Sequence, residues 1–216
     1  MAKTEPSFAL FERMADRYDT WYERNKVIAE NEARLVEEFP ARPPSVEVGA
    51  GTGYFASKLG VDVAVEPALS MLTRAWRRGV EAVQAVGENL PLRSGSFNTV
   101  YIIVTLCFLD SPEPVVEEAA RILTRTGRLV SCIVPRDSSW GRYYTELGRM
   151  GHPLYSVARF YTVEEMNDLF AGVGLNPAKI MGTLSFKPWE PPRPEEPRPW
   201  RPGADLGFVC VEYRWS

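Results

Sequence analysis

The chain has 216 residues, 45% of them hydrophobic, which suits one domain with a full core. Its net charge of −3 provides no basic face for a nucleic-acid backbone, and no apolar run is long enough to span a membrane. The first residues are charged too early and too often for a signal peptide, so we expect a cytoplasmic protein. The three cysteines, Cys107, Cys132 and Cys210, lie far apart in apolar runs, which favours buried free thiols over a disulfide or a metal site.

Helical periodicity extends from Phe8 to Phe39, with a break near residues 18–21. Tyr18, Trp21 and Tyr22 lie in this otherwise charged stretch, where they could cover a pocket or, more simply, pack into the core. The sequence ARPP at residues 41–44 ends the helix before the first strand, because proline cannot donate a ladder hydrogen bond.

The stretch VEVGAGTGYFASKLG, residues 46–60, predicts a strand, a turn with three glycines and a helix. Gly49, Gly51 and Gly53 can adopt positive φ and let a ligand approach the backbone amides. Glu47 would repel a pyrophosphate but would accept a ligand that carries an ammonium group. Glu66 ends the next strand, where it could accept hydrogen bonds from both hydroxyls of a ribose. A tight turn without a ligand is the alternative interpretation.

The middle of the chain continues the alternation of strands and helices. We expect a helix over residues 68–79, a strand over 82–86, a buried strand over 99–104, a helix over 114–123 and a strand over 128–134. A polar turn over residues 87–89 follows the third strand and could bind the edge of an adenine ring. Five strand and helix units in succession predict a parallel α/β sheet.

Residues 138–157 are rich in aromatic residues and glycine and have no clean period, as expected of a substrate cover beyond the sheet. Thr162 begins a helix to Phe170 with Glu165 as the partner of a capping box. Two strands follow, over residues 179–186 and 207–214. Residues 187–203 between them are so rich in proline that we expect an extended hairpin loop rather than a peptide ligand for a partner.

Four motifs in order, EVGAGTGYF, VEP, GENLPLRSGSF and LTRTGRLV, resemble a class I S-adenosylmethionine-dependent methyltransferase, in the branch related to ubiquinone biosynthesis methyltransferases. YDTWY near the start also resembles the leading segment of that family, and the similarity covers residues 11–186. The resemblance implies an α/β, Rossmann-like, doubly wound sheet of seven strands, mostly parallel with an antiparallel last strand and with helices on both faces. We expect a single domain over residues 1–216, with residues 1–40 as a helical cover and residues 138–161 as a substrate-cover insertion.

The resemblance also assigns site residues. Glu47 and the three glycines would hold the methionine part of the cofactor, Glu66 the ribose, and residues 87–89 the adenine. The family often has an Asp where this chain has Val86 and another where it has Asn98, so the adenine contact falls to backbone amides. The full set expected to bind S-adenosylmethionine is Tyr18, Glu47, Gly49, Ala50, Gly51, Gly53, Glu66, Pro67, Met71, Gly87, Glu88, Asn89, Val104 and Thr105.

A sulfonium is already an activated methyl donor, so the enzyme needs chiefly to align the acceptor and exclude water, with neither a triad nor a metal. His152, the sole histidine, is the candidate general base; a structural loop histidine is the alternative. Tyr22, Tyr155 and Arg159 are the candidate substrate contacts, although Arg159 could be a surface charge.

The function that follows is methyl transfer to a small-molecule acceptor by in-line displacement. A catalytically inactive cofactor-binding sensor or partner subunit is the main alternative. A dehydrogenase that uses NAD is weaker, because Glu47 and Tyr54 depart from the dinucleotide pattern. Nucleic-acid methylation is not expected, since VTLCFLD stands where an Asn-Pro-Pro-Tyr motif would follow the fourth strand.

Overall fold

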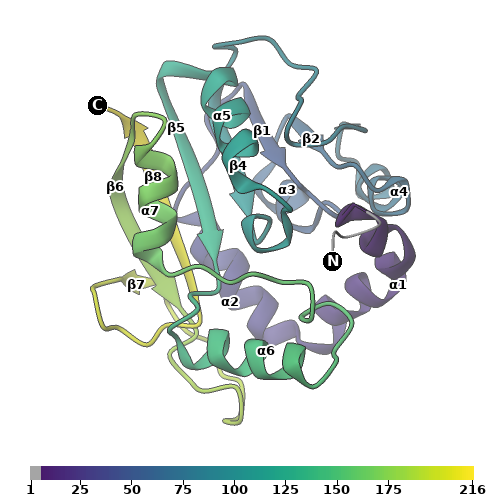
Figure 1. Ribbon diagram of the computed structural model, residues 1–216, viewed down its shortest axis with the longest axis vertical. Coiled ribbons are helices and arrows are strands. Elements are labelled where there is room, and N and C mark those ends of the chain that lie inside the picture. The colour runs from purple at the N-terminus through teal and green to yellow at the C-terminus, as the bar shows by residue number, and fades with distance from the viewer. Residues whose placement is uncertain (1–5) are drawn as a thin grey trace.

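The computed structural model describes residues 6–216. One sheet has the strand order β3-β2-β1-β4-β5-β8-β6-β7 (Figure 1). Its strands are β1 (Ser45–Val48), β2 (Val63–Val65), β3 (Ala82–Val83), β4 (Phe97–Ile103), β5 (Leu123–Ile133), β6 (Leu175–Thr183), β7 (Arg198–Pro199) and β8 (Phe208–Trp215). The first five pair in parallel, and β8 runs antiparallel between β5 and β6. This confirms the Rossmann-like fold with an antiparallel last strand.

Among residues 6–216 the sheet has eight strands rather than the expected seven. The additional strand is β7, two residues within the proline-rich segment 187–203 that pair antiparallel with β6. Other strands differ in their bounds: β3 ends at Val83, and β6 begins at Leu175. The proline-rich sequence therefore predicted the hairpin loop, but it gave no sign of the short edge strand within the loop, because proline is usually taken as evidence against a strand.

The helices are α1 (Phe8–Arg24), α2 (Lys26–Glu37), α3 (Tyr54–Leu59), α4 (Leu69–Arg77), α5 (Pro112–Ile122), α6 (Ser139–Arg149) and α7 (Val163–Ala171), with a 3₁₀ turn at Leu106–Phe108. The N-terminal helix breaks at Asn25, with φ of −112°, and not near residues 18–21. The aromatic residues in α1 therefore lie on one continuous helix. Thr162 and Glu165 form the predicted capping box at the start of α7.

Two apolar layers cover the sheet, because successive side chains of each central strand point to opposite faces. In β4, Val100 and Ile102 belong to the layer with α5 and α7, whereas Tyr101 and Ile103 belong to the layer with α2 and α3. The arrowheads of β4 and β5 point toward α6, and α1 lies on the same side (Figure 1). These elements surround the carboxyl ends of the parallel strands, where ligands bind in such sheets.

Residues 138–161 contain a regular helix, although we expected no clean period there. The side chain of Ser138 accepts a hydrogen bond from the Gly141 N–H, 3.0 Å away, and so caps α6. Aromatic residues hide the helical period, because they lie both on the buried face, as Trp140 does, and on the exposed one, as Tyr143 does.

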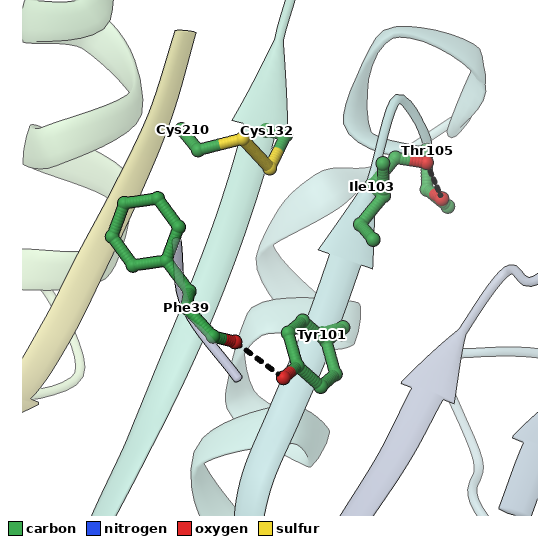
Figure 2. The surroundings of a disulfide bond; sticks show 6 residues. All are labelled: Phe39, Tyr101, Ile103, Thr105, Cys132 and Cys210. Carbon is green, nitrogen blue, oxygen red and sulfur yellow. Dashed lines mark hydrogen bonds between the residues drawn. A yellow bond between two sulfur atoms is a disulfide. The ribbon is translucent and has the colours of Figure 1, made fainter. Parts of the chain in front are cut away.

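The expectation of three free thiols is wrong for two of them. Cys132 on β5 and Cys210 on β8 form a disulfide (Figure 2), and Cys107 is free and buried. The two residues are register partners in the antiparallel pair, with Cα atoms 4.0 Å apart. The disulfide could not be predicted from the sequence, because the two cysteines are 78 residues apart and become neighbours only where β8 pairs with β5.

Within residues 6–216, no helix combines the length and the apolar character needed to cross a bilayer.

Candidate active site

The glycine turn between β1 and α3 has the positive φ angles that its sequence predicts. They are 74° at Gly49, 56° at Gly51 and 75° at Gly53. A Cβ at Gly49 would collide with the side chain of Thr105, and one at Gly53 would lie 2.8 Å from Ala75 Cβ. These two glycines are thus required by packing. A Cβ at Gly51 would instead make an ordinary van der Waals contact with Tyr18 Cε1, 3.8 Å away, without a clash, which leaves room for a ligand against the backbone.

Glu66 lies at the end of β2, opposite this turn. Its Oε2 accepts the N–H of Gly51 at 2.9 Å, and its Oε1 accepts the N–H of Ala68 at 2.9 Å. Burial raises the pKa of Glu66 to about 7, and the two backbone hydrogen bonds oppose this rise. Each carboxylate oxygen retains a free lone pair, so it can still accept from a hydroxyl.

Glu47 lies within β1 and is buried, and its Oε2 has no hydrogen-bond partner among the described residues. Burial raises the pKa of this carboxyl well above its ordinary value, although a hydrogen bond from the backbone of Ala56 opposes the rise. A buried acceptor without a partner is unfavourable, so a donor from a ligand would stabilise it.

A first cavity opens beside the glycine turn and fits a nucleoside in its chemistry: polar groups at Gly51 and Glu66, and apolar walls elsewhere. Ten of the residues predicted to bind the cofactor line it: Tyr18, Gly49, Gly51, Glu66, Pro67, Met71, Gly87, Glu88, Val104 and Thr105. Four do not: Glu47 in β1 and Ala50 and Gly53 in the turn are buried, and Asn89 is exposed. Sequence reasoning missed the apolar wall, which includes Phe8, Phe11, Ile103, Leu109 and Val115.

Val104 directly follows β4 and has a φ of +52°, which is unusual for a β-branched residue. Its N–H donates to the carbonyl of Cys132, 2.9 Å away, and so holds this conformation in place. The hydroxyl of the next residue, Thr105, contacts the carbonyls of Ile103 at 3.1 Å and Gly49 at 3.2 Å (Figure 2 shows the first). Backbone strain of this kind concentrates at ligand sites.

A second cavity of about 650 Å³ adjoins the first. Both are lined by Tyr18, Val104 and Phe108, which therefore mark their junction. Aromatic residues from α1, from α6 and from the following loop form much of its wall: Trp21, Tyr22, Trp140, Tyr143, Tyr144, Tyr155 and Phe160. The proline-rich segment closes another side with Pro188, Glu190 and Pro192.

The structure brings three of the four predicted catalytic and substrate residues to this cavity. Tyr22, Tyr155 and His152 line it. Arg159 does not: it is exposed, with its guanidinium 5.2 Å from the ring centre of Tyr161. The position of Arg159 is therefore that of a surface charge. Its backbone N–H donates a hydrogen bond to the carbonyl of Cys107, 2.7 Å away.

His152 stacks on Tyr155, with the ring centres 4.5 Å apart, and its Nδ1 lies 3.5 Å from the Tyr155 N–H donor nitrogen. Burial, and to a smaller extent Arg17, lowers the pKa of His152 from its ordinary value. The lowered pKa favours the neutral imidazole, which is the form that can accept a proton.

Sequence reasoning missed Glu32, a buried acidic residue of α2 on the wall of the second cavity. Burial raises its pKa to about 8. A signal was present: Glu32 lies four residues after Ile28 and four before Val36, so it falls on the apolar stripe of α2.

Within residues 6–216, no group of three or more His, Cys, Asp or Glu side chains is arranged to hold a metal.

Comparisons with known proteins agree with this geometry. Residues 46–131 match the family model of a methyltransferase domain. A crystal structure of a methyltransferase from Thermotoga maritima, described as SAM-dependent and as a possible histamine N-methyltransferase, is 33% identical. It superposes with a TM-score of 0.91 over 96% of this chain and 99% of its own.

An uncharacterized protein of Mycobacterium tuberculosis is 37% identical over 85% of this chain, which spans 66% of that relative's length. Geranyl diphosphate C-methyltransferase of Streptomyces coelicolor, solved with S-adenosyl-L-homocysteine, shares the fold at 14% identity, with a TM-score of 0.62 over 90% of this chain and 84% of its own. S-adenosylmethionine is the cofactor of these methyltransferases, and the first cavity, with polar groups at Gly51 and Glu66, is compatible with it. The chain belongs to the class I S-adenosylmethionine-dependent methyltransferases.

Proposed function

We propose that the protein is an active methyltransferase that transfers the methyl group of S-adenosylmethionine to a small molecule held in the second cavity. The observation that carries this proposal is the junction of the two cavities at Tyr18, Val104 and Phe108. A donor bound beside the glycine turn and an acceptor bound among the aromatic residues would meet there. The volume of about 650 Å³ suits a small organic ligand.

Each part of the cofactor has candidate partners. Glu66 would accept from the ribose hydroxyls, since both of its oxygens retain acceptor capacity. Glu47 and the glycine turn would receive the methionine part, and Gly87 and Glu88 would lie at the adenine. When bound, the sulfonium supplies an activated methyl group. The protein's own contribution is then to orient the acceptor and exclude water.

Helix α1 would have to move for the cofactor to bind. Ser7, Phe8 and Phe11 lie over the first cavity, whose volume is about 90 Å³, well below that of usual ligand pockets. Ion pairs with α4, Arg74 with Asp16 and Arg78 with Asp19 at 2.7 Å, hold α1 in this position. The second pair is partly buried, with side chains 28% and 25% exposed, and Phe11 also packs edge to face on Phe108. Opening would have to break these contacts, and cofactor binding would have to compensate for them. This supports residues 1–40 as a cover.

His152 is the candidate proton acceptor for an acceptor group that must lose a proton. Its neutral imidazole lies on the cavity wall beside Tyr155. The aromatic wall itself would exclude water and pack on the apolar body of the acceptor. The small acceptor is in keeping with the description of the Thermotoga relative as a possible histamine N-methyltransferase. The ubiquinone-related branch, the cytoplasmic location and the absence of a nucleic-acid partner stay predictions.

Incubation with S-adenosylmethionine labelled in its methyl group tests the proposal. A cell extract would be divided by dialysis into small molecules and macromolecules, and each fraction supplied as acceptor. We expect label in the small-molecule fraction only. Label in macromolecules would contradict the proposed acceptor class. Tight cofactor binding with no transfer to either fraction would favour the inactive sensor.

A further inference from the structure

We propose that the acceptor is a small organic amine whose cationic head is bound by the Glu32 carboxylate among the tyrosines of the second cavity. This rests on the proposed function, because it concerns the substrate class of the same cavity. The argument starts from Glu32, to which the resemblance assigned no role.

Glu32 is isolated in its surroundings. It is 7% exposed, and among residues 6–216 its carboxyl has no hydrogen bond or ion pair. Five charged residues line the cavity: Asp16, Arg17, Arg24, Glu32 and Glu190. The first three are exposed, and Glu190 accepts from the Lys187 N–H and pairs with Arg193. Glu32 is therefore the buried carboxyl of this cavity, without a partner among residues 6–216, and a bound ammonium would favour its ionised form.

A buried carboxyl without a partner destabilises the fold unless a ligand compensates it. An anionic ligand would be repelled, and a neutral hydroxyl would supply only one donor. A primary ammonium supplies a charge and three donors. The field of the Glu32 carboxylate also reaches the cavity tyrosines, because it contributes to the raised pKa values of Tyr18, Tyr22, Tyr144 and Tyr155.

These tyrosines form two pairs on different elements. Tyr18 and Tyr22 on α1 meet edge to face, with ring centres 5.7 Å apart, and Tyr144 on α6 stacks on Tyr155 at 4.3 Å. Aromatic faces attract ammonium groups, most strongly where water is excluded. The carboxyl and the rings thus select for the same kind of ligand: an organic cation with an apolar body.

The helix that carries Glu32 also fixes the proline-rich segment. Asn31 donates through Nδ2 to the Arg193 carbonyl at 2.8 Å and accepts the Glu195 N–H at 2.9 Å. Since Pro188 and Pro192 line the cavity, Asn31, the neighbour of Glu32, holds the segment that forms this part of the wall. This gives the proline-rich segment a role in shaping the cavity.

Calorimetry of the protein saturated with S-adenosyl-L-homocysteine tests the inference. The probes are phenethylamine and 2-phenylethanol, which have the same body and differ in the head group. We expect the wild type to bind the amine at least about tenfold more tightly than the alcohol. Glu32→Gln should lose this preference. Glu30→Gln is the matched control, because Glu30 lies exposed on the same helix, and it should keep the preference.

Equal binding of the two probes by the wild type, no detectable binding of the amine, or an unchanged preference in Glu32→Gln would each overturn the proposal. Should Glu32→Gln fail to fold, by circular dichroism, the wild-type comparison of amine and alcohol still decides. The two proposals fail in different ways: a wild type that does not bind S-adenosyl-L-homocysteine contradicts the proposed function, whereas one that binds it but shows no amine preference contradicts only the assignment of an amine.

Discussion

The backbone N–H of Gly51 donates a hydrogen bond to Glu66 Oε2 over 2.9 Å. This contact joins the turn after β1 to the acidic end of β2, two features 15 residues apart in the sequence. It also means that the carboxylate expected to bind the ribose is already oriented before a ligand arrives. Pre-orientation of this kind reduces the entropy lost when the ligand binds.

Gly51→Ala should weaken cofactor binding without unfolding the protein. The new methyl group would project into the first cavity, near Tyr18. The backbone of residue 51 would have to keep its φ of 56°, which costs an alanine about 1–2 kcal/mol of stability. Gly60→Ala is the matched control, because Gly60 has a φ of 61° and open space around its Cβ position. Calorimetry should show lower affinity for S-adenosylmethionine in Gly51→Ala alone. Equal losses in both variants would mean that strain, and not the ligand contact, is responsible.

Affinity for S-adenosylmethionine should rise as the pH increases from about 6 to about 8, because Glu66 with its pKa of about 7 must ionise to accept two hydroxyl donors. Binding should therefore release a proton, measured by calorimetry in buffers of different ionisation enthalpy. Glu66→Gln should bind about 10–100-fold more weakly and lose this pH dependence. Glu117→Gln, an exposed change on α5, should retain both. A flat affinity profile in the wild type would contradict the ribose assignment.

The parallel half of the sheet, and the position of the first cavity beside it, could be predicted because each signal is local. The glycine turn, Glu66 and the buried run of β4 are read within a few neighbouring residues. What could not be predicted depends on distant pairings. The Cys132–Cys210 disulfide requires the position of β8. The sequence left open whether Arg159 is a substrate contact or a surface charge, because its direction depends on the loop after α6. Glu32 was visible as an acidic residue on an apolar stripe, but only the cavity shows what it faces.

His152→Ala should lower turnover while cofactor affinity stays near that of the wild type, because His152 lines the second cavity and not the first. The expected loss is about 10²–10⁴-fold if the imidazole accepts a proton in the reaction. His152→Asn keeps a polar side chain of similar reach and provides the comparison. If Asn restores most of the rate, His152 is a wall of the cavity rather than a base, and the general-base assignment is wrong.

Reduction of the disulfide should destabilise the fold, because Cys132 and Cys210 close a loop with a sequence separation of 78. Chain-entropy reasoning gives about 4–5 kcal/mol for a loop of this length, and typical contributions of disulfides are about 2–4 kcal/mol. Denaturation of the wild type with and without a thiol reductant measures it, and Cys132→Ala/Cys210→Ala should not respond to the reductant. Cys107→Ala leaves the disulfide intact and should respond like the wild type. Peptide mapping that finds three free thiols under non-reducing conditions would contradict the pairing.

Glu32→Gln should stabilise the ligand-free protein at alkaline pH and leave it unchanged in acid. Burial raises the pKa of Glu32 from its ordinary value of 4.5 to about 8, so the folded state holds this proton more tightly than the unfolded state. Its contribution to stability is complete below the unfolded value and is lost as the pH rises through the folded value. A neutral glutamine has no such loss. Near pH ~8.5 the free energy of unfolding of the variant should therefore exceed that of the wild type, by no more than a few kcal/mol. Near pH ~4 the two values should be equal.

Chemical denaturation at several pH values measures this difference, and Glu30→Gln should show none of it. Glu47 and Glu66 also have raised pKa values, but they titrate equally in variant and wild type and cancel in the comparison. A variant less stable than the wild type at the alkaline end would mean that the carboxylate has a stabilising partner. The expected result would instead show that this carboxyl is retained at the expense of stability, as functional groups in binding sites often are.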